Sequence, residues 1–161
     1  MSDFKREPEK YSKFQVKVMM EKKDVADNPW TDVSWKSIGV MIDSRSDPEV
    51  KRFERVVSDS DYEQYLWSGL SLSLYVDECE SYYYNLLSET PLIFVISRQN
   101  EVLNLPEPFL VTASFDEANA YQESDELVYS APVSPDIYCR IEGFVLENYV
   151  PEKKIKRKRK E

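Results

Sequence analysis

The 161-residue sequence contains no histidine, so it lacks the side chain that most often acts as a general base near neutral pH. The same absence removes histidine-based catalytic triads and most zinc sites. The two cysteines, Cys79 and Cys139, are far apart and do not form a metal-binding motif. Only three glycines occur, which leaves little material for a glycine-rich phosphate loop. The composition therefore predicts no catalytic residue, no metal and no cofactor.

Neither cysteine has the surroundings of an activated nucleophile. Cys79 is flanked by Glu78 and Glu80, and nearby negative charge opposes formation of the thiolate. Cys139 precedes Arg140 near the start of a predicted helix, but a packed or surface thiol is the simpler interpretation. We therefore expect two thiols without a catalytic role.

Long apolar runs are also missing. No stretch of 18 apolar residues occurs, so the sequence predicts no membrane-spanning helix. The first ten residues are charged and lack the apolar centre of a secretory signal. We therefore expect a cytoplasmic protein in which both cysteines are reduced.

Charge is distributed unevenly along the chain. The sequence has 30 acidic and 21 basic residues, but seven of the last eleven residues are basic: Lys153, Lys154, Lys156, Arg157, Lys158, Arg159 and Lys160. Without this tail, which also holds two acids, 14 basic and 28 acidic residues remain. The tail could be simply solvated, could dock on an acidic protein surface, or could bind an anionic polymer. The acidic body favours a protein over nucleic acid as its partner.

Alternating apolar and polar residues predict a sheet with one buried face. The clearest alternation runs from Leu70 to Val76. We expect further strands at 14–20, 35–42, 81–87, 92–97 and 109–113. The segment 77–80 is typical of a hairpin connection, and Pro106 and Pro108 indicate a loop.

Helix signals follow the predicted strands. Ser114 and Glu117 have the spacing of a capping box, which predicts a helix to about residue 122. Ser134 followed by Pro135 predicts the start of a second helix that ends near Tyr149. One face of this helix is apolar, with Ile137, Ile141, Phe144 and Val145.

This order predicts an α+β fold. We expect an antiparallel, meander-like sheet of six to eight strands, which could close into a barrel, followed by two C-terminal helices. We assign residues 13–150 to a single domain. A flexible extension, 1–12, precedes it, and the basic tail, 151–161, follows it.

Several motifs occur in an order that resembles one known family. They are Asn28-Pro29-Trp30, Trp35, Gly39-Val40, Tyr82 to Leu86, Pro108 to Ala118, Ala131 to Pro135, and the basic end. Together they resemble an uncharacterised bacterial family of small single-domain proteins, encoded beside formate dehydrogenase genes. The resemblance covers about residues 13–160. It implies an accessory role near a molybdenum- or tungsten-dependent formate dehydrogenase, and it supplies no catalytic residues.

We therefore expect a non-enzymatic accessory or small-subunit protein that binds a protein partner, with formate dehydrogenase subunits as the candidates. The alternative is a nucleic-acid or anion-binding regulatory protein that acts through the basic tail. Tyrosine and tryptophan are common at interface hot spots, although core packing explains most of those in this chain. The predicted partner-binding residues are Trp30, Trp35, Tyr83 and the seven basic residues of the tail.

Overall fold

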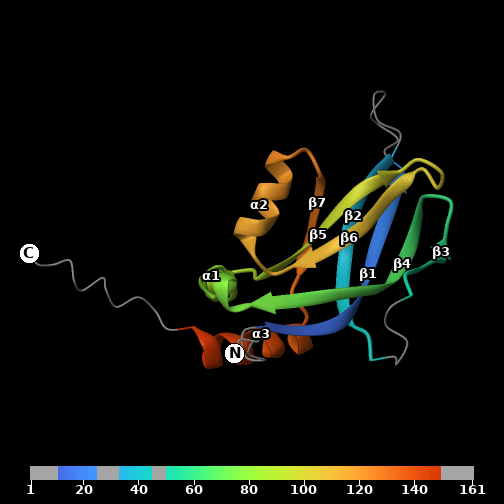
Figure 1. The fold of residues 1–161 in the computed structure, drawn as a ribbon. Helices are drawn as coiled ribbons and strands as arrows, with labels where there is room; N and C mark the ends of the chain where they lie inside the picture. The colour runs from blue at the N-terminus through green and yellow to red at the C-terminus, as the bar shows by residue number, and fades with distance from the viewer. Residues whose placement is uncertain (1–10, 25–32, 45–49, 150–161) are drawn as a thin grey trace, which may run out of the picture.

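The computed structural model describes residues 11–24, 33–44 and 50–149 (Figure 1). These residues form seven strands and three α-helices. In chain order the elements are β1 (Tyr11–Asp24), β2 (Val33–Ile42), β3 (Arg52–Ser58), β4 (Tyr62–Tyr75), α1 (Cys79–Leu87), β5 (Leu92–Asn100), β6 (Leu105–Thr112), α2 (Phe115–Glu123), β7 (Leu127–Pro132) and α3 (Pro135–Asn148). A 3₁₀ turn, Val76–Glu78, leads from β4 into α1.

The strands form one curved sheet in the order β2-β1-β4-β6-β5-β7, and β3 is added beside β4. The two end strands of this order, β2 and β7, contact each other, so the sheet is nearly closed like a barrel. The α+β class and the barrel-like sheet are therefore confirmed. The expectation of a purely antiparallel sheet was wrong, because β4 and β6 pair in parallel at Leu72 and Val111.

Strand β4 changes neighbours along its length, and Gly69 lies at the change. Residues before Gly69 pair with β3, whereas Leu72, after it, pairs with β6. The backbone of Gly69 has φ +82°, a left-handed conformation that favours glycine. An added Cβ would also overlap with the carbonyl oxygen of Val50 and with Lys51. Glycine at this position therefore allows β4 to pair with β3 in its first part and with β6 in its second part.

The core lies between the inner face of the sheet and the helices. The alternating residues of β4, Leu70, Leu72 and Leu74, are buried together with Val16 and Val18 of β1. The predicted apolar stripe of α3 packs into the same cluster, which confirms the last helix: Ile137, Ile141, Phe144 and Val145. Burial of one such side chain typically stabilises a fold by about 1.5–3 kcal/mol.

The segment predicted as a strand at 81–87 is part of helix α1, and the predicted hairpin at 77–80 is the end of the 3₁₀ turn and the first residues of this helix. Three consecutive tyrosines favour strands, but packing decides the conformation here. Cys79 and Tyr82 are buried one helical turn apart, and the Tyr82 hydroxyl accepts a 3.0 Å hydrogen bond from the Tyr75 backbone N–H. These contacts fix α1 as a helix between β4 and β5.

Helices and strands also alternate more than the sequence suggested. Strand β7 separates α2 from α3, so 109–113 is not the last strand. Pro106 and Pro108 lie inside β6 and not in a loop. They pair with Gln99 and Ser97 of β5, whereas on its other side β6 pairs with β4 at Val111. Neither proline is paired with β4, so a missing N–H removes no ladder bond on that side.

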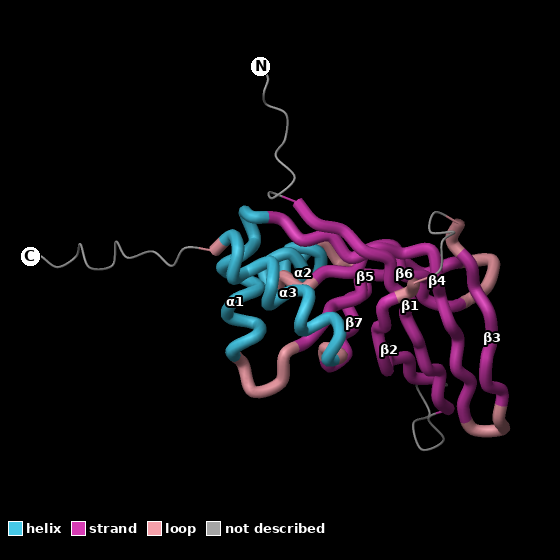
Figure 2. Tube along the Cα trace, turned by 90° about the horizontal axis from the view of Figure 1, so that it is seen from below, coloured by secondary structure: helices cyan, strands magenta, loops and turns pink. Residues whose placement is uncertain are grey.

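The helices gather at one end of the molecule, and β1, β2, β3 and β4 extend toward the other (Figure 2). We call the part formed by α1, α2 and α3 the helical end. Within the described residues, no helix combines the length and apolar character needed to cross a membrane. Trp30 and the basic tail, 151–161, lie outside the described residues, as do residues 1–10 of the predicted extension 1–12.

Candidate protein-interaction surface

Two of the predicted partner-binding residues are described, and they lie at different places. Trp35 is half-buried on β2, with its ring 5.6 Å from that of Tyr65, and packs against the core. Tyr83 is half-buried on α1 and faces α3, where its ring lies 5.0 Å from that of Tyr149. The structure therefore does not bring Trp35 and Tyr83 into one patch. Their role in binding stays a prediction.

Helix α1 is flanked by a hollow on each side. Its inner residues, Cys79 and Tyr82, are buried, whereas Tyr84 and Leu87 are 58% and 63% exposed. On one side lies a hollow shared with α3. On the other lies a groove shared with α2 and the start of β5, which we call the α1–α2 groove. Both contain exposed apolar groups of the kind that mark contact surfaces.

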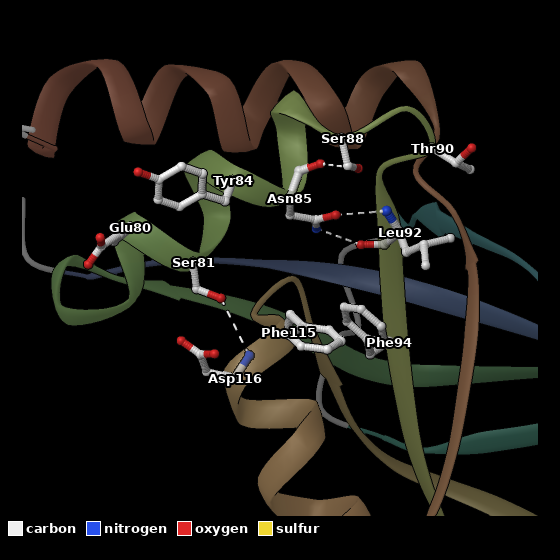
Figure 3. A pocket seen from close by; sticks show the side chains of 10 residues that line it. All are labelled: Glu80, Ser81, Tyr84, Asn85, Ser88, Thr90, Leu92, Phe94, Phe115 and Asp116. Atoms are coloured by element: carbon white, nitrogen blue, oxygen red, sulfur yellow. Dashed lines mark hydrogen bonds between the residues drawn. The ribbon is translucent and has the colours of Figure 1, made fainter.

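The α1–α2 groove has a volume of about 630 Å³ (Figure 3). Its lining comes from three elements and the loops beside them: Glu80, Ser81, Tyr84, Asn85, Ser88, Thr90, Leu92, Phe94, Phe115 and Asp116. Phe94 is buried, and its ring centroid lies 6.1 Å from that of Phe115, which is 56% exposed. The groove thus combines a buried apolar base with two accessible aromatic rings, Tyr84 and Phe115.

Asn85 fixes the position of α1 beside this groove (Figure 3). Its Nδ2 group donates hydrogen bonds to the carbonyl oxygens of Leu92 and Ala113, at 2.8 and 3.0 Å. Its Oδ1 atom accepts a 3.0 Å hydrogen bond from the Leu92 N–H. Both donors of the amide are therefore in use. This side chain ties α1 to β5 and to the residue after β6.

A hydrogen-bonded cluster fixes the start of α2 on the same side. Ser114 is fully buried, and its Oγ accepts a 3.0 Å hydrogen bond from the Glu117 N–H, which confirms the predicted N-cap. Ser114 Oγ also donates to Glu78 at 2.6 Å. The Glu117 carboxylate accepts from the Thr112 hydroxyl at 2.6 Å, so it does not close the capping box on the Ser114 N–H. These bonds join α2 to the turn before α1.

Among the described residues, no cation lines the groove to compensate its negative charge. Its lining contains two carboxylates, Glu80 and Asp116, and no lysine or arginine. Neither carboxylate forms an ion pair with a described residue. From residue 56 to 149 the sequence has 17 acidic residues and two basic ones, Arg98 and Arg140. Arg98 is already paired with Glu126 at 3.1 Å, so the helical end is strongly acidic.

The hollow between α1 and α3 is smaller, with a volume of about 260 Å³. Tyrosine and leucine side chains dominate it: Tyr83, Leu86, Leu87, Tyr138, Val145, Leu146 and Tyr149, with Glu142. Leu146 is 77% exposed. The predicted Tyr83 is therefore part of an apolar surface, although it is not in the larger groove.

Neither cysteine contributes to the α1–α2 groove. Cys79 is buried, and burial raises the pKa of its thiol to about 11, which disfavours the reactive thiolate. The sequence attributed this poor reactivity to Glu78 and Glu80, but burial is the main cause. Cys139 is exposed on α3, and both thiols are free. Among the described residues, no three potential metal ligands of the Cys, Asp or Glu type cluster together.

Sequence reasoning missed the residues that define the groove. The predicted strand at 81–87 gives Tyr84 no place in a groove, and the capping box treats Phe115 only as part of a helix start. The available signal was an apolar residue, Phe115, directly after the N-cap serine and beside acids. Leu92 and Phe94 gave no signal beyond a buried strand.

Comparison with known proteins places the chain in a family. A family model described as "Protein of unknown function (DUF3305)" matches residues 15–159. No curated protein and no solved structure matches the chain.

Proposed function

We propose a function from the premise that the chain belongs to the DUF3305 family of proteins of unknown function. The proposal is that it is a non-enzymatic accessory protein that binds another protein through its helical end. One observation carries this proposal. The α1–α2 groove exposes the rings of Tyr84 and Phe115 beside the unpaired carboxylates of Glu80 and Asp116.

The composition of the groove supports a protein partner. Aromatic side chains are enriched at interface hot spots because each ring buries a large area at a small entropic cost. Here the rings of Tyr84 and Phe115 are more than half exposed, and both residues belong to helices that pack on the core. The Asn85 bonds and the Ser114 cluster hold these helices in place before a partner arrives. Such preorganisation lowers the entropy lost on binding.

Formate dehydrogenase subunits are the partners that we propose to test first, because the resemblance of the sequence implies them. The test is to purify the tagged full-length chain from its source cell at low salt and to identify the co-purifying proteins by mass spectrometry. The comparison variant is Y84A/F115A, and the matched control is V102A, which alters a 92% exposed residue of the β5–β6 turn.

We expect a dehydrogenase subunit to accompany the wild-type chain and V102A, and to be lost from Y84A/F115A. Recovery of no dehydrogenase subunit from the wild type would contradict the proposed partner. Equal recovery of the same partner with Y84A/F115A would contradict the proposed surface. A thermal unfolding curve for each variant separates loss of binding from loss of folding.

The alternative function, binding of nucleic acid or another polyanion, depends on the seven basic residues of the tail. The 17 acidic residues between positions 56 and 149 oppose it, because they repel the same polymer. We therefore expect the full-length chain to pass through a heparin column at about 50 mM salt, where phosphate-binding proteins are retained. Strong retention that disappears when the seven basic residues are replaced by glutamine would favour the alternative.

A further inference from the structure

We propose that the α1–α2 groove binds an arginine side chain that a segment of the partner protein presents. This inference rests on the proposed function and names the chemistry that the groove recognises. Three features carry it: accessible aromatic faces, two unpaired carboxylates, and an amide that has no donor to offer a ligand.

The aromatic residues suit a planar cation with an apolar stem. Tyr84 comes from α1 and Phe115 from α2, and both rings lie along the groove (Figure 3). A guanidinium group stacks on such rings, and the attraction increases when the site is partly shielded from water. The aliphatic part of arginine can pack on Leu92 and Phe94 at the base of the groove. A lysine ammonium lacks the planar face and is more strongly hydrated.

The carboxylates supply the complementary charge. Glu80 comes from α1 and Asp116 from α2, and Figure 3 shows both at the same end of the groove, on either side of Ser81. Carboxylates bind guanidinium groups through paired, charge-assisted hydrogen bonds. The adjoining acidic hollow, which contains Asp77, Glu78 and Glu117 beside Asp116, adds negative potential from the same direction. An anionic ligand would be repelled at this site.

The Asn85 amide, which also lines the groove, does not compete for this role. Both Nδ2 donors of Asn85 are held by the carbonyl oxygens of Leu92 and Ala113. Asn85 therefore holds α1 in place beside the groove. The tyrosine and phenylalanine rings and the two carboxylates are the groups available to bind a ligand. These features suit a site that selects a cation by charge and stacking, because no described residue of the groove lining is a cation that could hold an acidic group.

The test measures binding of short fluorescent peptides to the full-length chain by fluorescence polarisation. One peptide alternates arginine with leucine, and its partner carries citrulline in place of arginine, which keeps the shape and removes the charge. The groove variant is E80Q/D116N. The control variant E101Q/E123Q removes the same amount of charge from two exposed residues that do not line the groove.

We expect the wild-type chain to bind the arginine peptide about tenfold more tightly than the citrulline peptide, a preference typical of one desolvated cation–aromatic and carboxylate contact. This preference should fall below about twofold in E80Q/D116N and stay unchanged in E101Q/E123Q. Equal binding of both peptides by the wild type would overturn the inference. Equal losses in the two variants would also overturn it, because diffuse attraction would then explain the binding.

The outcomes separate this inference from the proposed function. If the cellular partner is retained by E80Q/D116N and lost from Y84A/F115A, the protein-binding function stands and the arginine-binding inference fails. If the arginine preference is observed but no protein co-purifies with the wild-type chain, the chemistry of the groove stands and the proposed function fails.

Discussion

The backbone of Gly69 has a left-handed conformation that residues with a side chain rarely adopt. Its φ of +82° is unfavourable for residues with a side chain, and an added Cβ would overlap with the Val50 carbonyl. We expect Gly69→Ala to lower the free energy of unfolding by about 2–4 kcal/mol, since backbone strain and a steric clash add together. Gly39→Ala is the matched control, because an added Cβ there meets no atom within 4 Å. Urea denaturation of the two variants measures the difference, and equal stability would contradict this role of Gly69.

Two buried serines differ in whether their hydroxyl groups form hydrogen bonds among the described residues. Ser97 is fully buried, and its Oγ has no hydrogen-bond partner among the described residues, whereas Ser114 Oγ bonds to Glu117 and Glu78. Ser97→Ala should therefore be neutral or stabilise the fold by about 1 kcal/mol, because it removes an unsatisfied group. Ser114→Ala should destabilise it by about 1–2 kcal/mol through loss of the N-cap. Thermal melting compares the two, and a greater loss in Ser97→Ala would show that its hydroxyl is bonded.

At the scale of elements, helices with local start signals were predictable and α1 was not. Helices α2 and α3 begin after Ser114 and Ser134, whose side chains accept backbone hydrogen bonds as the sequence indicated. Helix α1 has no side-chain cap, and its three tyrosines favour strands. Its conformation depends on the buried contacts of Tyr82 and on the Asn85 bonds to Leu92, which join residues seven positions apart. The groove depends on the same contacts, so its lining could not be predicted from local patterns.

The position of α1 is expected to depend on Asn85. Asn85→Ala removes three hydrogen bonds and leaves the Leu92 and Ala113 backbone groups without this partner, so we expect a loss of about 2–4 kcal/mol. The change should also weaken the binding of the arginine peptide, because α1 carries Tyr84 and Glu80. Asn119→Ala, on the exposed surface of α2, is the control. Native-state hydrogen exchange should show faster exchange in α1 of Asn85→Ala, and unchanged exchange would argue against this anchoring role.

At the scale of the whole molecule, charge is distributed unevenly between the earlier and the later part of the chain. The described residues up to position 55 include eight basic and four acidic residues, whereas residues 56–149 have 17 acidic and two basic ones. The sequence showed an acidic body and a basic tail, and the structure places most of the acids of the later segment on and around the helical end. The near-closure of the sheet could not be predicted from local sequence patterns, because the contact between β2 and β7 joins segments that are remote in sequence.

This concentration of like charge should make stability depend on salt. Repulsion among the acids of the helical end is screened as ionic strength rises. We expect the free energy of unfolding to increase by about 1 kcal/mol between low and moderate sodium chloride, and to increase less in E80Q/D116N. Urea denaturation at several salt concentrations checks this expectation. A decrease in stability would indicate that attractive ion pairs dominate.

The most direct test of the central claim, that the helical end binds a protein, is photo-crosslinking in the source cell from position 84. Tyr84 is replaced by a photoreactive phenylalanine analogue, and Val102, which is more exposed but lies on the β5–β6 turn, is replaced in a control chain. The account predicts a discrete protein adduct from position 84, with a formate dehydrogenase subunit as the expected partner, and no such adduct from position 102. No adduct from position 84, or the same adduct from both positions, would contradict it.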